Sequence, residues 1–217
     1  YASRFFARIL MPIRIKFEKF LPYNISFSQF GEDQYFINFE KNIGKYVEIG
    51  CNHPTLASNS FRLYLSGWSG LVIDGNTRYK KLWGAARPKD RFVNTLISAD
   101  TQKDVPFYEH YAGFVSTAVK EHASQFDEED FNLTYKDSLN INEVLAKNNI
   151  NRIDILFIDI EGMDYEVLSS LDFDQYQPKF ICIEDHNFQK DYLGLGNSEI
   201  NTYLQKKGYL LDGMLNP

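Results

Sequence analysis

Residues 153–162 read IDILFIDIEG, an apolar run that ends in two acidic residues and a glycine. The run is short, rich in isoleucine and bounded by Asp159, which is typical of a β-strand. Near-continuous apolar runs of this kind suit strands that helices cover on both faces, as in a parallel sheet. We therefore expect a buried strand over Ile153–Ile158, with Asp159 and Glu161 directly beyond its carboxyl end.

Similar apolar runs, separated by helical patterns, lie along the chain on both sides of this stretch. They predict further strands at Lys45–Ile49, Leu71–Ile73, Arg91–Ile97, Phe180–Ile183 and Tyr209–Leu211. The helical patterns between them cover Thr55–Leu65, Arg78–Gly84, Ile141–Asn148, Asp164–Leu171 and Ser198–Lys207. Alternating strands and helices predict a doubly wound α/β sheet. Val105–Tyr111 interrupts the pattern as an inserted strand or hairpin arm, and we expect residues 112–135 to form a long loop with a helix on the substrate side.

The length and composition exclude several classes of protein. A chain of 217 residues favours one full domain with decorations. Its 44% hydrophobic and 24% charged residues exclude a disordered, collagenous or coiled-coil protein. No apolar run approaches the ~18 residues that a transmembrane helix needs. Two cysteines, Cys51 and Cys182, exclude a disulfide scaffold and a cysteine-rich zinc site, and they suit a cytoplasmic location.

The charge is distributed unevenly along the chain, whose net charge is −6. Residues 1–25 form a basic amphipathic N-terminal segment with five Arg and Lys residues against one Glu. This segment could contact an anionic membrane surface peripherally, or it could be a helix that packs on an acidic body formed by residues 26–217. An acidic body argues against nucleic acid as a partner. No signal peptide is expected, because no apolar stretch precedes a small-residue cleavage site.

Chemically useful residues follow the predicted strands, and ligands of an open α/β sheet bind where parallel strands end. Gly50 allows a tight turn after the first strand. Asn52 stands where a GxGxxG dinucleotide motif would have its second glycine, which disfavours NAD or FAD. Asp74 ends the second strand, and its carboxylate could accept bonds from both hydroxyls of a ribose.

Four predicted strands end in acidic residues at one edge of the sheet. Such clustering is costly unless a cation lies among the carboxylates. A sulfonium, a metal ion or a protonated histidine would meet this need, and His186 follows the last of these strands after Glu184 and Asp185.

These pieces together resemble the FkbM family of S-adenosylmethionine-dependent methyltransferases. The matching segments are Ser28–Asp33, Tyr46–Gly50, Asp74, Ile153–Gly162, Glu166–Leu168 and Glu184. The resemblance implies a class I, Rossmann-like methyltransferase domain over residues 26–217. Its sheet would be mostly parallel and seven-stranded, with helices on both faces and an antiparallel last strand. It also implies methyl transfer to oxygen, often on sugars or glycosylated products.

The resemblance also implies a set of cofactor-binding residues. Glu48 and Gly50 would face the methionine end of S-adenosylmethionine, Asp74 would hold the ribose, and Ser98 would lie near the adenine. The whole expected set comprises Ser28, Gln29, Glu32, Asp33, Glu48, Gly50, Asn52, Asp74, Asn76, Ser98 and Asp159. The chain departs from the family at Asn52–Pro54, where a more glycine-rich loop is usual. It also departs at Asp74–Asn76, where the family usually shows a Glu with Pro next, and Asp keeps the carboxylate on a shorter arm.

A sugar hydroxyl is a poor nucleophile, so a base or a metal must help to remove its proton. His186 is the best candidate for the base, with Asp159 and Glu161 as second choices. Asp159, Glu184 and Asp185 offer hard oxygen ligands that suit Mg²⁺. We therefore expect an O-methyltransferase of a sugar or glycoconjugate. The alternatives are a metal-dependent O-methyltransferase of a small phenolic or natural-product acceptor, and an inactive cofactor-binding module of a glycan-assembly complex.

Overall fold

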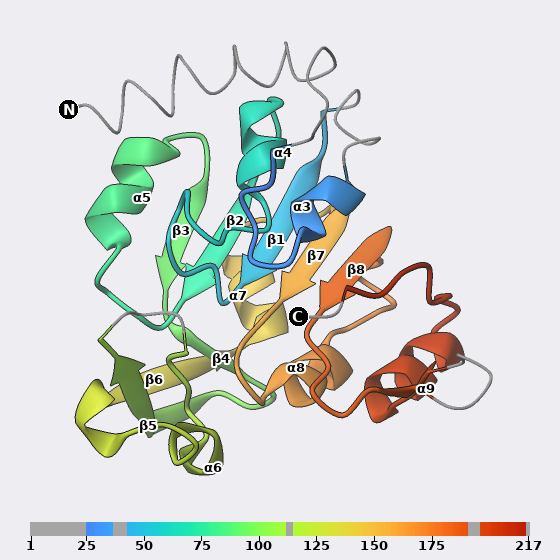
Figure 1. Cartoon of the computed structure of the whole chain (residues 1–217). Helices are drawn as coiled ribbons and strands as arrows, with labels where there is room; N and C mark the ends of the chain where they lie inside the picture. Colours follow the sequence, from blue (N-terminus) through green and yellow to red (C-terminus); the bar gives the residue numbers. More distant parts are fainter. Residues whose placement is uncertain (1–24, 37–42, 112–114, 191–195, 216–217) are drawn as a thin grey trace.

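A five-stranded parallel sheet forms the centre of the molecule (Figure 1). The computed structural model describes residues 25–36, 43–111, 115–190 and 196–215. The strands of the central sheet are β1 (Lys45–Ile49), β2 (Ser69–Asp74), β3 (Arg91–Asn94), β7 (Ile155–Ile158) and β8 (Phe180–Ile183). Their order is β3-β2-β1-β7-β8, and each neighbouring pair is parallel. The direction of winding therefore reverses between β1 and β7.

Helices cover both faces of this sheet, as its alternating apolar side chains require. Tyr46 and Phe157 belong to the core on one face, whereas Val47 and Leu156 belong to the core on the other. The first face lies under α3 (Glu32–Tyr35), α4 (Phe61–Leu65) and α5 (Lys80–Ala86). The second face lies under α7 (Ile141–Lys147), α8 (Asp164–Ser170) and α9 (Glu199–Lys206). The predicted three-layer α/β class is confirmed.

A second sheet adjoins the carboxyl edge of the first (Figure 1). It contains β4 (Leu96–Ser98), β5 (Gln102–His110) and β6 (Phe131–Asn140), with β6 in the middle. Strands β5 and β6 are antiparallel, and the chain between them forms α6 (Lys120–Ala123) and a 3₁₀ turn (Glu128–Asp130). A short antiparallel pair, β9 (Gln189–Lys190) and β10 (Gly196–Asn197), precedes α9.

Several predicted elements differ from the structure. The run Arg91–Ile97 was expected as one strand but is divided between two sheets: β3 pairs with β2, whereas β4 pairs with β6. Where β3 ends, the Asn94 side chain donates to the carbonyls of Asp74 (2.7 Å) and Gly75 (3.1 Å). The strand expected at Tyr209–Leu211 is wrong: this segment is irregular, and Leu210 is 89% exposed. The helix expected from Thr55 begins at Phe61. The described residues place five strands in the central sheet, so the seven-stranded form is not confirmed.

Two further expectations concern the membrane. Within the described residues, none of the helices has both the length and the apolar character needed to cross a bilayer. The basic N-terminal segment lies outside the described residues except for Ile25, so its amphipathic character stays a prediction.

Candidate active site

A cavity of about 1200 Å³ opens at the carboxyl ends of β1, β2, β7 and β8. Gly50, Asp74, Asp159 and Glu184 from these four strand ends all line it. The position is the one where a doubly wound sheet binds ligands, beside the strand pair at which the winding reverses. The volume exceeds the ~300–1000 Å³ of most single-ligand pockets, so the cavity can hold a cofactor and an acceptor together.

Gly50 brings the ends of β1 and β7 into close contact. Its φ of 80° lies in the left-handed region, and a Cβ atom there would be 1.7 Å from the Asp159 carbonyl oxygen. The amides of Gly50 and Cys51 both donate to the Ile73 carbonyl, at 2.9 and 3.1 Å. A glycine is therefore required at this turn, because any side chain would overlap the backbone that follows β7.

Asp74 anchors the turns on either side of it. Its carboxylate accepts the amides of Asn52 (2.7 Å) and Asn76 (2.6 Å). Burial raises the pKa of this carboxyl group, and the two amides partly offset that effect. A carboxylate offers about four lone-pair positions, so two remain for ligand hydroxyls.

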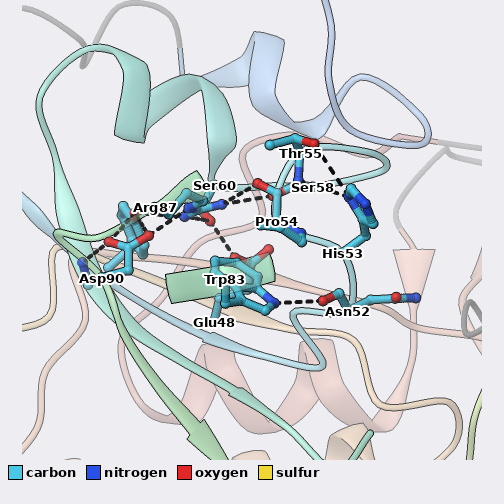
Figure 2. A network of polar contacts seen from close by, with 12 residues as sticks. Glu48, Asn52, His53, Pro54, Thr55, Ser58, Ser60, Trp83, Arg87 and Asp90 are labelled. Carbon is cyan, nitrogen blue, oxygen red and sulfur yellow. Dashed lines mark hydrogen bonds and ion pairs between the residues drawn. The ribbon is translucent and has the colours of Figure 1, made fainter. Parts of the chain in front are cut away.

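Arg87, at the end of α5, holds the loop after β1 (Figure 2). It is fully buried and donates to Asp90 (2.6 Å), Tyr46 (2.7 Å) and Ser60 (2.6 Å). It also donates to the Pro54 carbonyl (3.2 Å), and the Trp83 indole donates to the Asn52 carbonyl (2.7 Å). Because the loop is fixed in this way, the predicted helical start at Thr55 is replaced by a loop that runs to Ser60.

Glu48 is part of the same network. It lines the cavity, yet its carboxylate accepts a hydrogen bond from the Ser60 hydroxyl (Figure 2). Burial raises its pKa to about 7, although the Arg87 charge acts in the opposite direction. Glu48 therefore links the cavity floor to the buried arginine.

The expected cofactor residues in the segment before β1 fall into two groups, those that line the cavity and those that bond within the segment. Gln29 and Glu32 line the cavity. Ser28 and Asp33 instead bond to each other (3.0 Å), and the fully buried Asp33 also accepts the Phe27 amide (2.7 Å). This pair fixes the segment from which Gln29 and Glu32 project.

Asn76 and Ser98 also lie outside the cavity lining. The Asn76 side chain accepts the Arg78 amide (2.8 Å) and begins the turn toward α5. Ser98 bonds to the Ser138 hydroxyl (2.7 Å) between β4 and β6. Both side chains are buried and engaged in local structure.

Acidic residues and histidines meet where β7 and β8 end. Carboxylate oxygens of Asp159, Glu161 and Glu184 lie within 4.8 Å of one another. Nε2 of His186 lies 3.1 Å from Oε2 of Glu184, and Nε2 of His122 lies 2.9 Å from Oε2 of Glu161.

Asp185 is not part of this group. It lines the cavity, but its carboxylate accepts the Asn187 amide (3.2 Å). The three oxygens brought together are thus those of Asp159, Glu161 and Glu184, with Glu161 in the place that the sequence assigned to Asp185.

The comparison with protein families agrees with this geometry. The Methyltransferase FkbM domain matches residues 32–211. This chain belongs to the FkbM methyltransferase family. No curated protein and no solved structure matched the chain. Use of S-adenosylmethionine is implied in general for a methyltransferase family.

The residues of this FkbM domain fit that cofactor. Gly50 and Asp74 both line the cavity, Asp74 keeps acceptor positions for hydroxyls, and the clustered carboxylates suit a sulfonium. The residues that line the cavity among the expected cofactor set are Gln29, Glu32, Glu48, Gly50, Asn52, Asp74 and Asp159.

Burial gives the acidic residues of the FkbM domain unusual proton affinities. It raises the pKa of Glu161 to about 8 and that of Glu184 to about 7. It also raises the pKa of Asp159, and the Glu184 charge adds to this effect. Groups with pKa values near neutrality can accept and release protons under physiological conditions.

His122 is the residue that the sequence does not reveal. It lies on α6, within the insertion between β5 and β6, yet its ring centroid is 5.5 Å from that of His186. Thr117 of the same insertion donates to the Glu161 carbonyl (2.9 Å) and ties the insertion to the loop after β7. No spacing in the sequence marks this contact, because the insertion folds back from a separate sheet.

Proposed function

We propose that this chain is an S-adenosylmethionine-dependent O-methyltransferase that methylates a hydroxyl of a sugar or glycoconjugate. The observation that carries the proposal is the His186–Glu184 pair, 3.1 Å apart, at the end of the strand that borders the expected cofactor site. Membership of the FkbM family supports methyl transfer in general. The His186–Glu184 pair supports oxygen as the atom that receives the methyl group, because a hydroxyl must lose a proton and this pair can accept it.

The residues at the ends of β1 and β2 would bind the cofactor. Asp74 would accept the ribose hydroxyls, and the backbone at Gly50 would lie against the methionine part. Gln29 and Glu32 would cover it from the N-terminal side. S-adenosylmethionine supplies an electrophilic methyl group when it is bound, and the fixed loop of Arg87 would keep its binding residues in place.

The His186–Glu184 pair would accept the proton of the acceptor hydroxyl. The pKa of Glu184, raised to about 7 by burial, is matched to this task near neutral pH. Asp159 and Glu161 are the alternative proton acceptors beside it. Much of the remaining rate enhancement would come from positioning the hydroxyl, which requires an acceptor held by several contacts.

The cavity favours an acceptor with many hydroxyls. Several acidic side chains line it, among them Glu32, Asp159, Glu161 and Glu184, and their carboxylates can accept hydrogen bonds from sugar hydroxyls. The second candidate, a metal-dependent enzyme for a small phenolic acceptor, is favoured by the oxygens of Asp159, Glu161 and Glu184 that lie within 4.8 Å of one another.

The test is transfer of a labelled methyl group to nucleotide sugars, lipid-linked glycans and simple phenols, followed by mass spectrometry. We expect a mass shift on a sugar-containing acceptor, and a loss of turnover in His186→Gln with unchanged cofactor affinity. His110→Gln is the matched control and should remain active. Methylation of phenols alone would support the second candidate. Cofactor binding without transfer to any acceptor would support the inactive module of a glycan-assembly complex.

A further inference from the structure

Three side chains with metal-binding chemistry converge from three separate elements of the fold. His122 comes from α6, Glu161 from the loop after β7, and His186 from the segment after β8. One ligand atom of each lies within 4.8 Å of the others. The group contains two imidazoles and one carboxylate, so it differs chemically from the all-oxygen group of Asp159, Glu161 and Glu184.

The backbone around Glu161 is held from two sides. Thr117 donates to its carbonyl (2.9 Å), and Asp164 accepts the flanking amides of Ile160 and Gly162 (both 3.1 Å). Glu161 itself has a φ of 54°, a conformation that is rare for a residue with a side chain. Backbone strain of this kind persists where the surroundings fix it, and here it directs a carboxylate toward two histidines.

The exposure of the three side chains leaves one side of the group open. The side chains of His122 and Glu161 are 13% and 15% exposed, whereas that of His186 is 46% exposed. Glu161 and His186 line the cavity. An ion held by this group would keep a coordination position accessible from the cavity, as catalytic metal sites with three protein ligands do.

We infer that His122, Glu161 and His186 bind a divalent transition-metal ion such as Zn²⁺. Imidazole nitrogens select such ions over Mg²⁺ and Ca²⁺, which prefer oxygen ligands. Bonds of about 2.0–2.1 Å place neighbouring ligand atoms roughly 3–3.5 Å apart, so small rotamer changes would close this group around an ion. With the ion bound, His186 serves as a ligand and Glu184 remains as the proton acceptor beside the cavity.

The experiment is a titration of the chelator-treated full chain with Co²⁺, read by visible absorption, with Zn²⁺ as competitor. We expect one equivalent of Co²⁺ to bind, Zn²⁺ to displace it, and a large excess of Mg²⁺ to leave it in place. The chain has four histidines. His122→Ala and His186→Ala should each weaken Co²⁺ binding more than about tenfold. His110→Ala, whose ring packs 5.1 Å from that of Phe131, is the control and should bind as the parent does.

Three results would overturn the inference. The first is the absence of stoichiometric Co²⁺ binding. The second is binding that persists in both histidine variants when thermal unfolding shows that they are folded. The third is retention of Co²⁺ by His122→Ala together with its loss in Asp159→Asn, which would place the ion in the all-oxygen group. The titration contains no S-adenosylmethionine, so its outcome is independent of the proposed methyl transfer.

Discussion

Asp74 combines an anchoring role with the expected recognition of the ribose. Its carboxylate already accepts the amides of Asn52 and Asn76, so truncation to alanine would release both turns. Asp74→Asn keeps the shape of the side chain and removes its charge. Because hydrogen bonds to a charged group are worth roughly 1.5–3 kcal/mol, we expect affinity for S-adenosylmethionine to fall about tenfold or more.

Calorimetry with S-adenosylmethionine checks this prediction, and thermal unfolding checks that Asp74→Asn is folded. Asp100→Asn, at an exposed position after β4, is the control. Unchanged affinity in Asp74→Asn would remove Asp74 from the cofactor site.

Glu48 predicts a dependence of stability on pH. Burial raises its pKa in the folded protein from 4.5 to about 7. Between these values the folded state retains a proton that the unfolded state has released. The contribution to stability is therefore complete below about pH 4.5 and is lost as the pH rises through about 7, with a magnitude of up to about 3 kcal/mol.

Urea unfolding at about pH 5 and pH 8 measures this effect. The free energy of unfolding should be lower at the higher pH, and Glu48→Gln should reduce the difference between the two values. Glu129→Gln, on the exposed 3₁₀ turn, should leave the difference as it is. An equal difference in parent and Glu48→Gln would contradict the prediction.

Individual site residues differ in how far the sequence reveals them. Asp74, Asp159 and Glu184 can be predicted, because each follows an apolar run and parallel strands end at one edge. Asp33 is a residue type that often binds ligands, but its carboxylate accepts hydrogen bonds from Ser26 and Phe27. These local bonds cannot be predicted from the sequence. His122 cannot be predicted, because its neighbours in space come from the ends of β7 and β8 rather than from its own segment.

At the scale of elements, two glycine substitutions test the close approach of β1 and β7. One lies in the turn after β1, and the other, in α5, is the control. Gly50→Ala would place a Cβ atom 1.7 Å from the Asp159 carbonyl at a φ of 80°. We expect it to destabilise the protein by at least about 2 kcal/mol and to abolish cofactor binding. Gly84→Ala in α5 meets nothing within 4 Å and should stabilise the protein by about 0.5–1 kcal/mol.

Thermal unfolding of both glycine variants provides the comparison. For a chain of this size, 1 kcal/mol corresponds to roughly 2–4 °C in Tm, so the two shifts should have opposite signs and clearly different sizes. A Gly50→Ala protein with the parent Tm would show that β1 and β7 do not approach as described.

How closely a predicted strand matches the structure depends on how clearly its sequence stands out as apolar. Strands β1 and β8 match their predicted bounds, because each is a compact apolar run between polar residues. Residues 131–135, the first half of β6, were expected as part of a loop, since the residues of this strand are mostly polar and partly exposed and pair there with β5 alone. The run from Arg91 gives no sign of its division, because its second half pairs with β6, which is distant in the sequence.

At the scale of the whole molecule, the order of the strands explains why one cavity collects the site. The chain builds β1, β2 and β3 outward in one direction and then returns to place β7 and β8 on the other side of β1. Alternating strands and helices were enough to predict a doubly wound sheet and its ligand-binding edge, but not the order of its strands. The number of strands could not be predicted in the same way, because an edge strand such as the one expected at Tyr209 depends on a partner that the sequence does not identify.

The division of the molecule into a basic N-terminal segment and an acidic body gives the last prediction. Arg62 is buried and donates to the Ile25 carbonyl (2.6 Å), so the chain from Ile25 onward is tied to the body. The described cavity lining begins at Gln29. Deletion of residues 1–24 should therefore change affinity for S-adenosylmethionine by less than about twofold. We propose that this segment holds the protein on anionic membranes, so the deletion should abolish binding to phosphatidylserine vesicles, and added salt should weaken the binding of the full chain. Calorimetry and vesicle sedimentation measure the two effects separately. A tenfold loss of cofactor affinity would place the segment over the cofactor instead, and vesicle binding that survives the deletion would assign the membrane contact to the body.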